Sequence, residues 1–478
     1  MKTSLALLAL ACAAARADFP AKTAELYLTR PGGGPGLERP ARLKFRPADQ
    51  PSERQPFVFV DPSKTFQTVV GIGAAITDAS ADVFASLPAR EQKQVLRAFF
   101  DRKRGIGYSL ARTNIHSCDF SSATYTYAPE GDASLARFSV AHDRVNRLPL
   151  LRRAIAAAGG ELTIFASPWS PPAWMKTNGD MLHGGSLRPE FARAWADYFV
   201  RFLRAYKAEG VPIWGVTVQN EPMASQPWES CVFTAAQERD FLKNDLGPAL
   251  AAAGFGGVKI LIWDHNRDLL YQYASTILRD PDAAKYVWGV AYHWYEDWAG
   301  GRPLYDNVRR LVQAYPDKPP FFSEGCECPS GAAKALRLDD WSLGEKYGRE
   351  MIEDFNSGTV AWTDWNMMLD ERGGPNHVGN FCYAALHADA KTHALHWTDI
   401  YDYMGHFSKF IRPGARRVAA TSSRAALKAT AFLDPDGSLA VVVMNGTDRS
   451  EDYRLLISGR AVKTTAPPHS IATLVVKR

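Results

Sequence analysis

The chain has 478 residues, which is too long for one ordinary compact domain and fits two or three domains, or one barrel with an appendage. Hydrophobic residues are 46% and charged residues 22% of the chain, close to globular averages, so wholesale disorder is excluded. The formal net charge is +5 with no long basic run, which argues against a nucleic-acid binder. No stretch beyond the N-terminus approaches about 18 uninterrupted apolar residues, so we expect no stable membrane insertion. The sequence leaves the oligomeric state open.

Residues 1–17 have the pattern of an export signal. Lys2 is the charged end, residues 5–15 form a short apolar run, and Ala15-Arg16-Ala17 is an A-x-A cleavage pattern before Asp18. The alternatives are a disordered apolar start and a lipid anchor at Cys12, whose sequence setting is poor for lipidation. We therefore expect a secreted or periplasmic protein.

Five cysteines follow the signal, an odd number in a large chain that needs no disulfide framework. Cys326-Glu-Cys328 is C-x-C and differs from the C-x-x-C of redox and zinc sites. We expect mostly free thiols and neither a metal nor an organic cofactor. The five are Cys118, Cys231, Cys326, Cys328 and Cys382.

From residue 66 the chain alternates strand-length apolar runs with amphipathic helical stretches, as βα units do. Helices are expected over 189–209 and over 234–253, where Thr234 is a plausible N-cap. The strands are expected at 67–72, 108–115, 162–166, 213–218, 258–263, 287–293, 320–323 and 359–365. These eight units favour an α/β fold of the (β/α)8 TIM-barrel type over residues 66–411. A doubly wound sheet is disfavoured because Gly71-Ile72-Gly73 lacks the third glycine of a phosphate loop.

Both chain ends look like short strands between turns. Residues 18–65 include the apolar pieces 26–28 and 57–60, separated by Pro- and Gly-rich segments. Residues 412–478 are expected to hold strands at 429–432, 439–445, 453–457 and 470–476. Each end is small for an independent sheet. We predict that the two ends pair into one all-β sandwich domain beside the barrel.

Catalytic residues of a barrel lie at the carboxyl ends of its strands, and two glutamates stand there. Glu221 follows the fourth predicted strand and Glu324 follows the seventh. Retaining glycosidases use two carboxylates about 5–5.5 Å apart, one as nucleophile and one as acid and then base. Either glutamate alone is more often an ordinary ion-pair partner. Both together, beside further polar and aromatic strand ends, favour a glycosidase site.

An ordered set of motifs resembles glycoside hydrolase family 30, and within it the glucosylceramidase branch. The motifs run from about residue 65 to 420, and the ordered set is more specific than Asn220-Glu221-Pro222 alone, which many barrel glycosidases share. They include Ser117-Cys118-Asp119-Phe120-Ser121, Ser167-Pro168-Trp169, Asn220-Glu221-Pro222, His293-Trp294-Tyr295, Ser323-Glu324, Trp362-Thr363-Asp364-Trp365-Asn366, Gly373-Gly374-Pro375-Asn376 and Gly405-His406-Phe407-Ser408-Lys409-Phe410-Ile411.

The resemblance implies a role for each matched residue. Glu221 matches the acid/base and Glu324 the nucleophile, while Asn220 would bind the sugar 2-hydroxyl. His293 and Tyr295 match a pair near the nucleophile. The residues implied to line the sugar pocket are Arg112, Asp119, Trp169, Trp365 and Asn380. The resemblance also implies a flanking β-domain made from both chain ends.

Physical arguments add expectations about charge. Glu324 should be ionised and steadied by donors such as Arg112 and Tyr295, and Glu221 should be protonated at the working pH. Asp78 is interpreted as a helix cap, and Asp364 as a buried structural residue rather than a sugar ligand.

The sequence therefore predicts an exported retaining β-glycosidase, with β-glucosidase or glucosylceramidase activity on a glycolipid or oligosaccharide β-glucoside. β-1,6-Glucanase, β-xylosidase and β-fucosidase are alternatives within the family. A non-catalytic carbohydrate-binding barrel is the alternative of another class. The animal lysosomal enzymes begin with closely spaced cysteines that this chain lacks, so the resemblance does not imply activator-protein dependence or lysosomal sorting. The loops that set aglycone choice, at 175–187, 296–307 and 326–341, are not close enough to theirs to imply the same lipid substrate.

Overall fold

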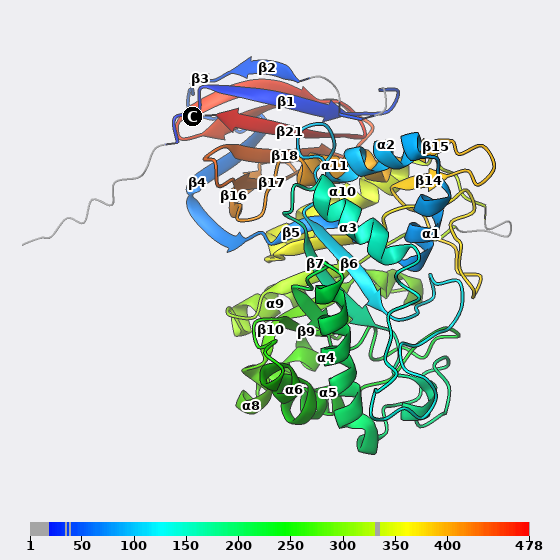
Figure 1. Ribbon diagram of the computed structural model, residues 1–478. Helices are drawn as coiled ribbons and strands as arrows, with labels where there is room; N and C mark the ends of the chain where they lie inside the picture. The colour runs from blue at the N-terminus through cyan, green and yellow to red at the C-terminus, as the bar shows by residue number, and fades with distance from the viewer. Residues whose placement is uncertain (1–18, 34–35, 38–39, 330–334, 478) are drawn as a thin grey trace, which may run out of the picture.

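The computed structural model describes residues 19–33, 36–37, 40–329 and 335–477. Residues 1–17, where the sequence predicts an export signal, lie outside the described residues. The described chain forms a closed barrel and a separate β-domain (Figure 1). This confirms the predicted fold class.

Eight parallel strands close the barrel in chain order, from β5 to β12 and back to β5. Their side chains are almost all buried, as expected for parallel strands covered by helices. The strands are β5 (Gly71–Ala75), β6 (Leu110–Ile115), β7 (Thr163–Pro168), β8 (Gly215–Thr217), β9 (Lys259–Asn266), β10 (Val287–His293), β11 (Pro320–Glu324) and β12 (Ala361–Asn366).

Helices follow the barrel strands and cover their outer face. Thr234 caps the predicted 234–253 helix with a capping box, in which Gln237 bonds back to the Thr234 backbone. A π-helical turn, η3 (Leu242–Leu246), interrupts that helix. The helices are α1 (Asp78–Ser86), α2 (Ala89–Phe100), α3 (Arg147–Ala157), α4 (Ala192–Ala208), α5 (Ala235–Phe241), α6 (Gly247–Ala252), α7 (Leu270–Leu278), α8 (Pro281–Ala284), α9 (Tyr305–Ala314), α10 (Trp341–Ser357) and α11 (Asp399–Ser408). Short 3₁₀ turns are η1 (Ala173–Met175), η2 (Pro189–Phe191) and η4 (Tyr295–Ala299).

Apolar side chains fill one end of the barrel interior. Four side chains are fully buried there: Leu110, Phe165, Leu261 and Phe321. The rings of Phe165 and Phe321 pack edge to face, with their centroids 4.9 Å apart. These residues lie near the amino ends or middles of their strands. The polar residues at the carboxyl ends therefore rest on a packed apolar floor.

The second part is a ten-stranded sheet built from both chain ends. β1 pairs with β21 along its whole length, so blue and red ribbons lie side by side in Figure 1. The strand order is β2-β1-β21-β18-β17-β16-β4-β19-β20-β3. The strands are β1 (Thr23–Thr29), β2 (Ala41–Lys44), β3 (Arg46–Pro47), β4 (Phe57–Thr68), β16 (Arg416–Ser422), β17 (Leu427–Leu433), β18 (Leu439–Asn445), β19 (Glu451–Ile457), β20 (Arg460–Ala466) and β21 (Ser470–Lys477). A three-stranded sheet of β13 (Leu369–Asp370), β14 (Leu386–Ala388) and β15 (Leu395–Trp397) adjoins the barrel helices.

Alternate residues of the long strands serve two different interfaces. In β18, Val441 and Val443 face the core of the sandwich, whereas Val442 and Met444 join the barrel core. Helices α10 and α11 lie between the sandwich and the barrel. The ring of Phe355 on α10 packs edge-on against the ring of Phe432 on β17, with the centroids 5.2 Å apart. This period-two division, typical of a strand buried on both faces, attaches the sandwich firmly to the barrel.

Some local predictions were wrong. The predicted strand at 67–72 is divided, because β4 continues to Thr68 within the sandwich sheet and the first barrel strand begins only at Gly71. The predictions also missed β16 and β20. Asp78 does not cap α1: Thr77 does, and Asp78 is buried against Arg147 at 3.2 Å.

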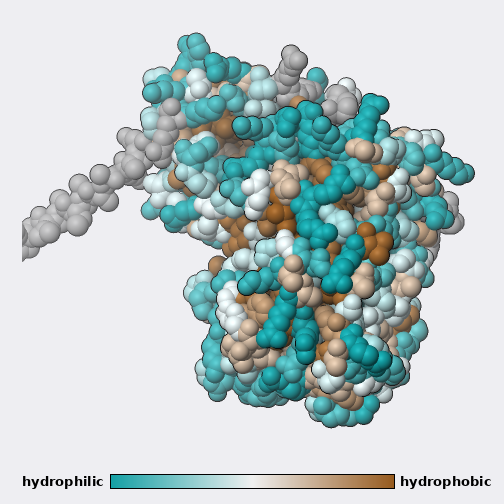
Figure 2. All heavy atoms as spheres, viewed as in Figure 1, coloured by the Kyte–Doolittle hydropathy of each residue, from teal (hydrophilic) through white to brown (hydrophobic). Residues whose placement is uncertain are grey.

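Most of the face seen in Figure 2 is hydrophilic, with smaller apolar groups between the polar residues. Among the described residues, none of the helices has the length and apolar character needed to cross a membrane.

Candidate active site

The two predicted glutamates face each other at the carboxyl end of the barrel. Glu324 is the last residue of β11, and Glu221 lies just beyond β8. One carboxylate oxygen of each, together with a ring nitrogen of His293, lie within 4.8 Å of one another. The backbone of Glu221 has a positive φ of 47°, an unfavourable conformation for a residue other than glycine. Strain of this kind is characteristic of functional sites.

Glu324 accepts hydrogen bonds on both carboxylate oxygens. Tyr295 Oη donates to Oε1 at 2.9 Å, and Arg112 Nη1 donates to Oε2. The other amino group of Arg112 donates to Asp264 Oδ2 at 2.8 Å and to Asn220 Oδ1 at 2.9 Å. Arg112 is fully buried, so a fixed guanidinium connects strands β6, β9 and β11 and orients the carboxylate of Glu324.

His293 is buried between two carboxylates. Its Nδ1 lies 3.2 Å from Glu221 Oε1, and its Nε2 lies 3.0 Å from Asp264 Oδ1. Burial alone would lower the pKa of His293, but the negative charge of Glu324 and the hydrogen bonds to Asp264 and Glu221 raise it to about 9. At neutral pH His293 is therefore an imidazolium that donates from both nitrogens.

The pKa values of the two glutamates shift in opposite directions. Burial acts to raise the pKa of Glu221, but the hydrogen bond from His293 and the charges of His265 and His293 outweigh it and lower the pKa. Burial raises the pKa of Glu324, although His293 and Arg112 oppose this. The lowered pKa of Glu221 runs against the expectation that Glu221 itself is protonated at the working pH, and the raised pKa of His293 favours the imidazole as the site of the proton. Hydrogen-bond donors on both carboxylate oxygens of Glu324 favour its ionised form.

Aromatic and amide side chains complete the pocket. Trp169 and Trp365 stack with their ring centroids 5.2 Å apart, and the guanidinium carbon of Arg112 lies 4.8 Å from the Trp169 centroid. Asn380 donates to Asp119 Oδ2 at 2.9 Å, while Asp119 Oδ1 is buried without a hydrogen-bond partner. That oxygen is positioned to accept a hydrogen bond from a hydroxyl group of a ligand.

Eight of the ten predicted site residues line this one pocket, and Arg112 and His293 lie directly behind it. The lining residues are Asp119, Trp169, Asn220, Glu221, Trp228, Tyr295, Trp298, Glu324, Cys326, Trp365, Asn380 and Cys382. Sequence reasoning did not select Trp228, Trp298, Cys326 or Cys382, because they lie beyond the barrel strands in segments whose path the strand pattern does not define.

Asp264 is a further functional residue that was not selected. It is fully buried and contacts Arg112, His293 and the Ser323 hydroxyl, which donates at 2.5 Å. Burial acts to raise the pKa of Asp264, but the charge of Arg112 and the hydrogen bond from His293 hold it far below its usual range. Its position at the end of a predicted barrel strand was the available signal. Asp364, by contrast, is buried and accepts from Tyr347 at 2.7 Å, as its structural interpretation predicted.

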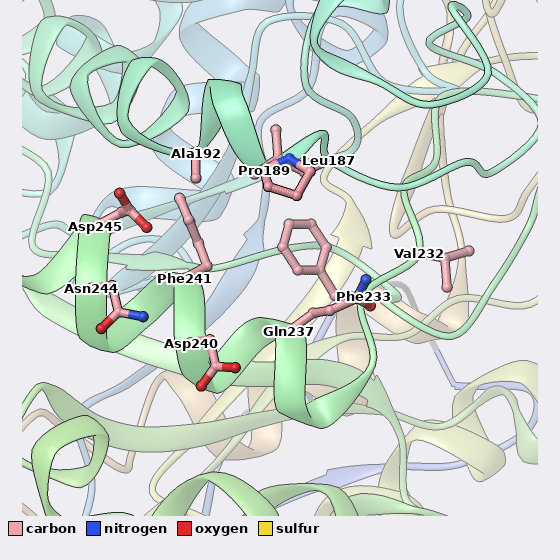
Figure 3. A pocket seen from close by; sticks show the side chains of 10 residues that line it. All are labelled: Leu187, Pro189, Ala192, Val232, Phe233, Gln237, Asp240, Phe241, Asn244 and Asp245. Atoms are coloured by element: carbon pink, nitrogen blue, oxygen red, sulfur yellow. The ribbon is translucent and has the colours of Figure 1, made fainter.

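A second cavity, of about 340 Å³, shares no lining residue with the carboxylate pocket. Phe233 and Phe241 line it, with Asp240 and Asp245 among its polar groups (Figure 3). Asp240 is paired with Arg239 at 2.8 Å, and neither aspartate lies in a donor set like that around Glu324. The arrangement suited to acid/base chemistry is therefore the narrower pocket.

Comparison with known proteins gives the same assignment for both parts of the chain. The glycosyl hydrolase family 30 TIM-barrel domain matches residues 69–411, and the family's beta sandwich domain matches residues 414–474.

Three relatives extend over most of the chain. Lysosomal acid glucosylceramidase of Mus musculus is 39% identical over 433 residues, covering 88% of this chain and 83% of that protein. Endo-1,6-beta-D-glucanase of Neurospora crassa is 30% identical over 413 residues, covering 82% and 81%. The crystal structure of SrfJ from Salmonella typhimurium has a TM-score of 0.89 and 32% identity, covering 95% of this chain and 100% of that one. The chain belongs to glycosyl hydrolase family 30 and is a glycoside hydrolase.

Proposed function

We propose that the chain is an exported retaining β-glycosidase that hydrolyses β-D-glucosides, with glucosylceramide as the leading substrate. The observation that carries the retaining mechanism is the close approach of the Glu221 and Glu324 carboxylate oxygens, within 4.8 Å. Retaining enzymes place the two carboxyl groups about 5–5.5 Å apart, whereas inverting enzymes leave about 6.5–9.5 Å for a water molecule. The donor sets support distinct roles, since only Glu324 is held by both Arg112 and Tyr295.

In the first step Glu324 attacks the anomeric carbon and the bond to the aglycone oxygen breaks. The stored proton passes from His293 through Glu221, 3.2 Å away, to the leaving oxygen, so Glu221 is left ionised and His293 neutral. The sugar is then an ester of Glu324, and the aglycone leaves as an alcohol. Trp169 and Trp365 offer apolar ring faces to the C–H surface of the sugar.

Formation of the ester removes the negative charge of Glu324. That charge is the largest electrostatic contribution that raises the pKa of His293, so its loss favours transfer of the proton away from His293 as the ester forms. The ionised Glu221 then accepts a proton from water and passes it back to His293, while the water oxygen attacks the anomeric carbon. The bond to Glu324 breaks and the sugar is released with its original β configuration.

The substrate assignment is supported by the relatives and by the rim of the pocket. The mouse glucosylceramidase is 39% identical, against 30% for the fungal 1,6-glucanase. Trp298 is 53% exposed at the pocket and stacks on Tyr295 with centroids 4.2 Å apart. An exposed ring beside the anomeric centre suits an apolar aglycone.

The substrate is tested by parallel hydrolysis assays on glucosylceramide, a β-1,6-linked glucan, and nitrophenyl β-glucoside, β-xyloside and β-fucoside. Release of glucose from the lipid with little from the glucan is the expected result. Preference for the glucan, the xyloside or the fucoside would overturn the lipid assignment and leave the mechanism intact. Hydrolysis of none would contradict the enzymatic assignment and favour a carbohydrate-binding barrel.

The retaining mechanism is tested by proton NMR of the first product formed from a β-glucoside. We expect β-glucose first, with the α anomer growing later by mutarotation. Initial α-glucose would mean inversion and contradict the role given to Glu324.

Export is tested by sequencing the mature N-terminus of the secreted or periplasmic fraction, where a start at Asp18 is expected. A full-length protein retained inside the cell would overturn that part.

A further inference from the structure

Three cysteines from two separate loops converge beside the candidate active site. Cys326 and Cys328 follow strand β11, and Cys382 lies ahead of β14. The Sγ atom of Cys382 is 3.3 Å from that of Cys326 and 3.1 Å from that of Cys328. None of the five described cysteines is in a disulfide. The C-x-C spacing alone gave no signal for this cluster, because its third member is 54 residues further along the chain.

We propose that Cys326, Cys328 and Cys382 form a binding site for one soft metal ion, such as Zn²⁺ or Cu⁺, in the wall of the active-site pocket. Thiolates are the ligands that select these ions. The three sulfur atoms all lie within 4.8 Å of one another. One ion with bonds of about 2.3 Å, the usual Zn–S length, reaches all three with little movement.

The surroundings suit binding from solvent. Cys326 and Cys382 are buried, whereas Cys328 is only partly buried and gives an incoming ion a route to the other two. An interior that needed only apolar packing would not require three sulfur atoms at this spacing, since other small residues fill such space. On binding, each thiol releases its proton to solvent and the ion keeps its oxidation state. A fourth position on Zn²⁺ remains for water.

Tyr295 couples this cluster to the carboxylates. Its hydroxyl lies 2.9 Å from Glu324 Oε1 and 3.4 Å from Cys326 Sγ. Binding of the ion converts the Cys326 thiol to a thiolate, and this altered sulfur acceptor competes with Glu324 for the hydrogen bond from Tyr295. We therefore expect the bound ion to inhibit hydrolysis. This expected inhibition rests on the proposed function, whereas binding of the ion does not.

The test is titration of the reduced full-length protein with Cd²⁺ and Zn²⁺. Cd²⁺ binding is followed by the ultraviolet sulfur-to-metal charge-transfer absorption, and Zn²⁺ binding by competition with a chromophoric chelator. We expect one ion per chain. Cys328→Ser removes one ligand without altering a residue that lines the pocket, and should weaken binding at least about 10-fold. Cys231→Ala, a buried cysteine outside the cluster, is the control and should bind as the wild type does.

Hydrolysis of a nitrophenyl glycoside is measured on the same samples. Inhibition by the ion should be strong in the wild type and in Cys231→Ala and weak in Cys328→Ser. Equal binding by Cys328→Ser and the wild type would overturn the site, as would absence of the charge-transfer band. Metal-free protein purified without reductant, with two of these cysteines joined in a disulfide, would also contradict it. Binding without inhibition would overturn only the coupling through Tyr295.

Discussion

His293 controls where the mobile proton of the site resides. The imidazole lies 3.2 Å from Glu221 and 3.0 Å from Asp264, and its pKa is raised to about 9 while that of Glu221 is lowered. In the proposed mechanism, the proton required by the departing aglycone is stored on the imidazole and delivered through the carboxylate. The pair acts as one acid with a macroscopic pKa.

Replacing this histidine tests the stored proton. In the wild type, kcat/KM should fall on the alkaline side as pH rises through the raised pKa near 9, because the pair then has no proton to donate. In His293→Gln the proton must reside on Glu221 itself, so this limb should move to lower pH by at least about one unit. Full pH profiles of kcat/KM check this. His396→Gln, at an exposed histidine of β15, should leave the limb in place, and an unmoved limb in His293→Gln would contradict the proton store.

At this scale the sequence predicted the residues that occupy strand ends or family motifs. Glu221, Glu324, Arg112 and His293 are of this kind, and the structure brings them together. Asp264 was not selected because its role depends on its contacts with Arg112, His293 and Ser323, which form only when the barrel closes. The cysteine cluster was missed because loop residues far apart in the chain carry no shared periodic pattern.

At the scale of elements, helices α10 and α11 approach closely at two glycines of α10. A Cβ atom added at Gly348 of α10 would lie 2.6 Å from the Cδ1 atom of Tyr403 on α11, and one at Gly344 would lie 2.4 Å from Cδ2 of the same ring. Tyr403 is fully buried and has little freedom to yield. The two glycines therefore allow the close contact that places both helices between barrel and sandwich.

Gly348→Ala should lower the midpoint of thermal unfolding. Overpacking costs about 1–3 kcal/mol, which exceeds the gain in helix propensity of up to about 1 kcal/mol. Calorimetry or circular dichroism measures the change. In a Tyr403→Ala background the ring is absent and the flexible Met444 side chain, whose Sδ atom would lie 3.1 Å away, is the remaining close neighbour, so the same substitution should cost much less. A raised unfolding midpoint for Gly348→Ala alone would show that the contact with Tyr403 does not exclude a larger side chain at this position.

Elements were predicted well where a hydrophobic run and a turn signal coincided. The strands Val287–His293 and Leu439–Asn445 match the prediction at both ends. The run at 67–72 misled because two strands of different sheets follow each other with only Val69 and Val70 between them. Both valines belong to apolar clusters, so periodicity contains no sign of the break.

At the scale of the whole molecule, barrel and sandwich share one core. Phe432 of the sandwich is fully buried and packs on Phe355 of α10, while Val442 and Met444 join the same cluster. The chain also crosses between the two parts twice: it enters the barrel from β4 and leaves it from α11 toward β16. The sandwich is therefore expected to stabilise the catalytic barrel rather than to fold apart from it.

Phe432→Ala should destabilise both parts together. Truncating a buried phenylalanine costs about 3–5 kcal/mol, and the loss falls on the shared interface. Differential scanning calorimetry should show one transition at a lower temperature. Phe66→Ala, at a ring that is 49% exposed, is the control and should change stability by at most about 1 kcal/mol. Two resolved transitions, with only one shifted, would contradict a shared core.

The central claim is that Glu324 becomes covalently bound to the sugar, and trapping that ester tests it most directly. A 2-deoxy-2-fluoro-β-glucoside with a good leaving group slows both steps and lets the intermediate accumulate. After digestion, mass spectrometry should find one fluoroglucosyl group per chain, on the peptide that contains Glu324, and none in Glu324→Gln. A label on Glu221 or on another residue, or steady turnover of β-glucosides by Glu324→Gln at the wild-type rate, would contradict the account.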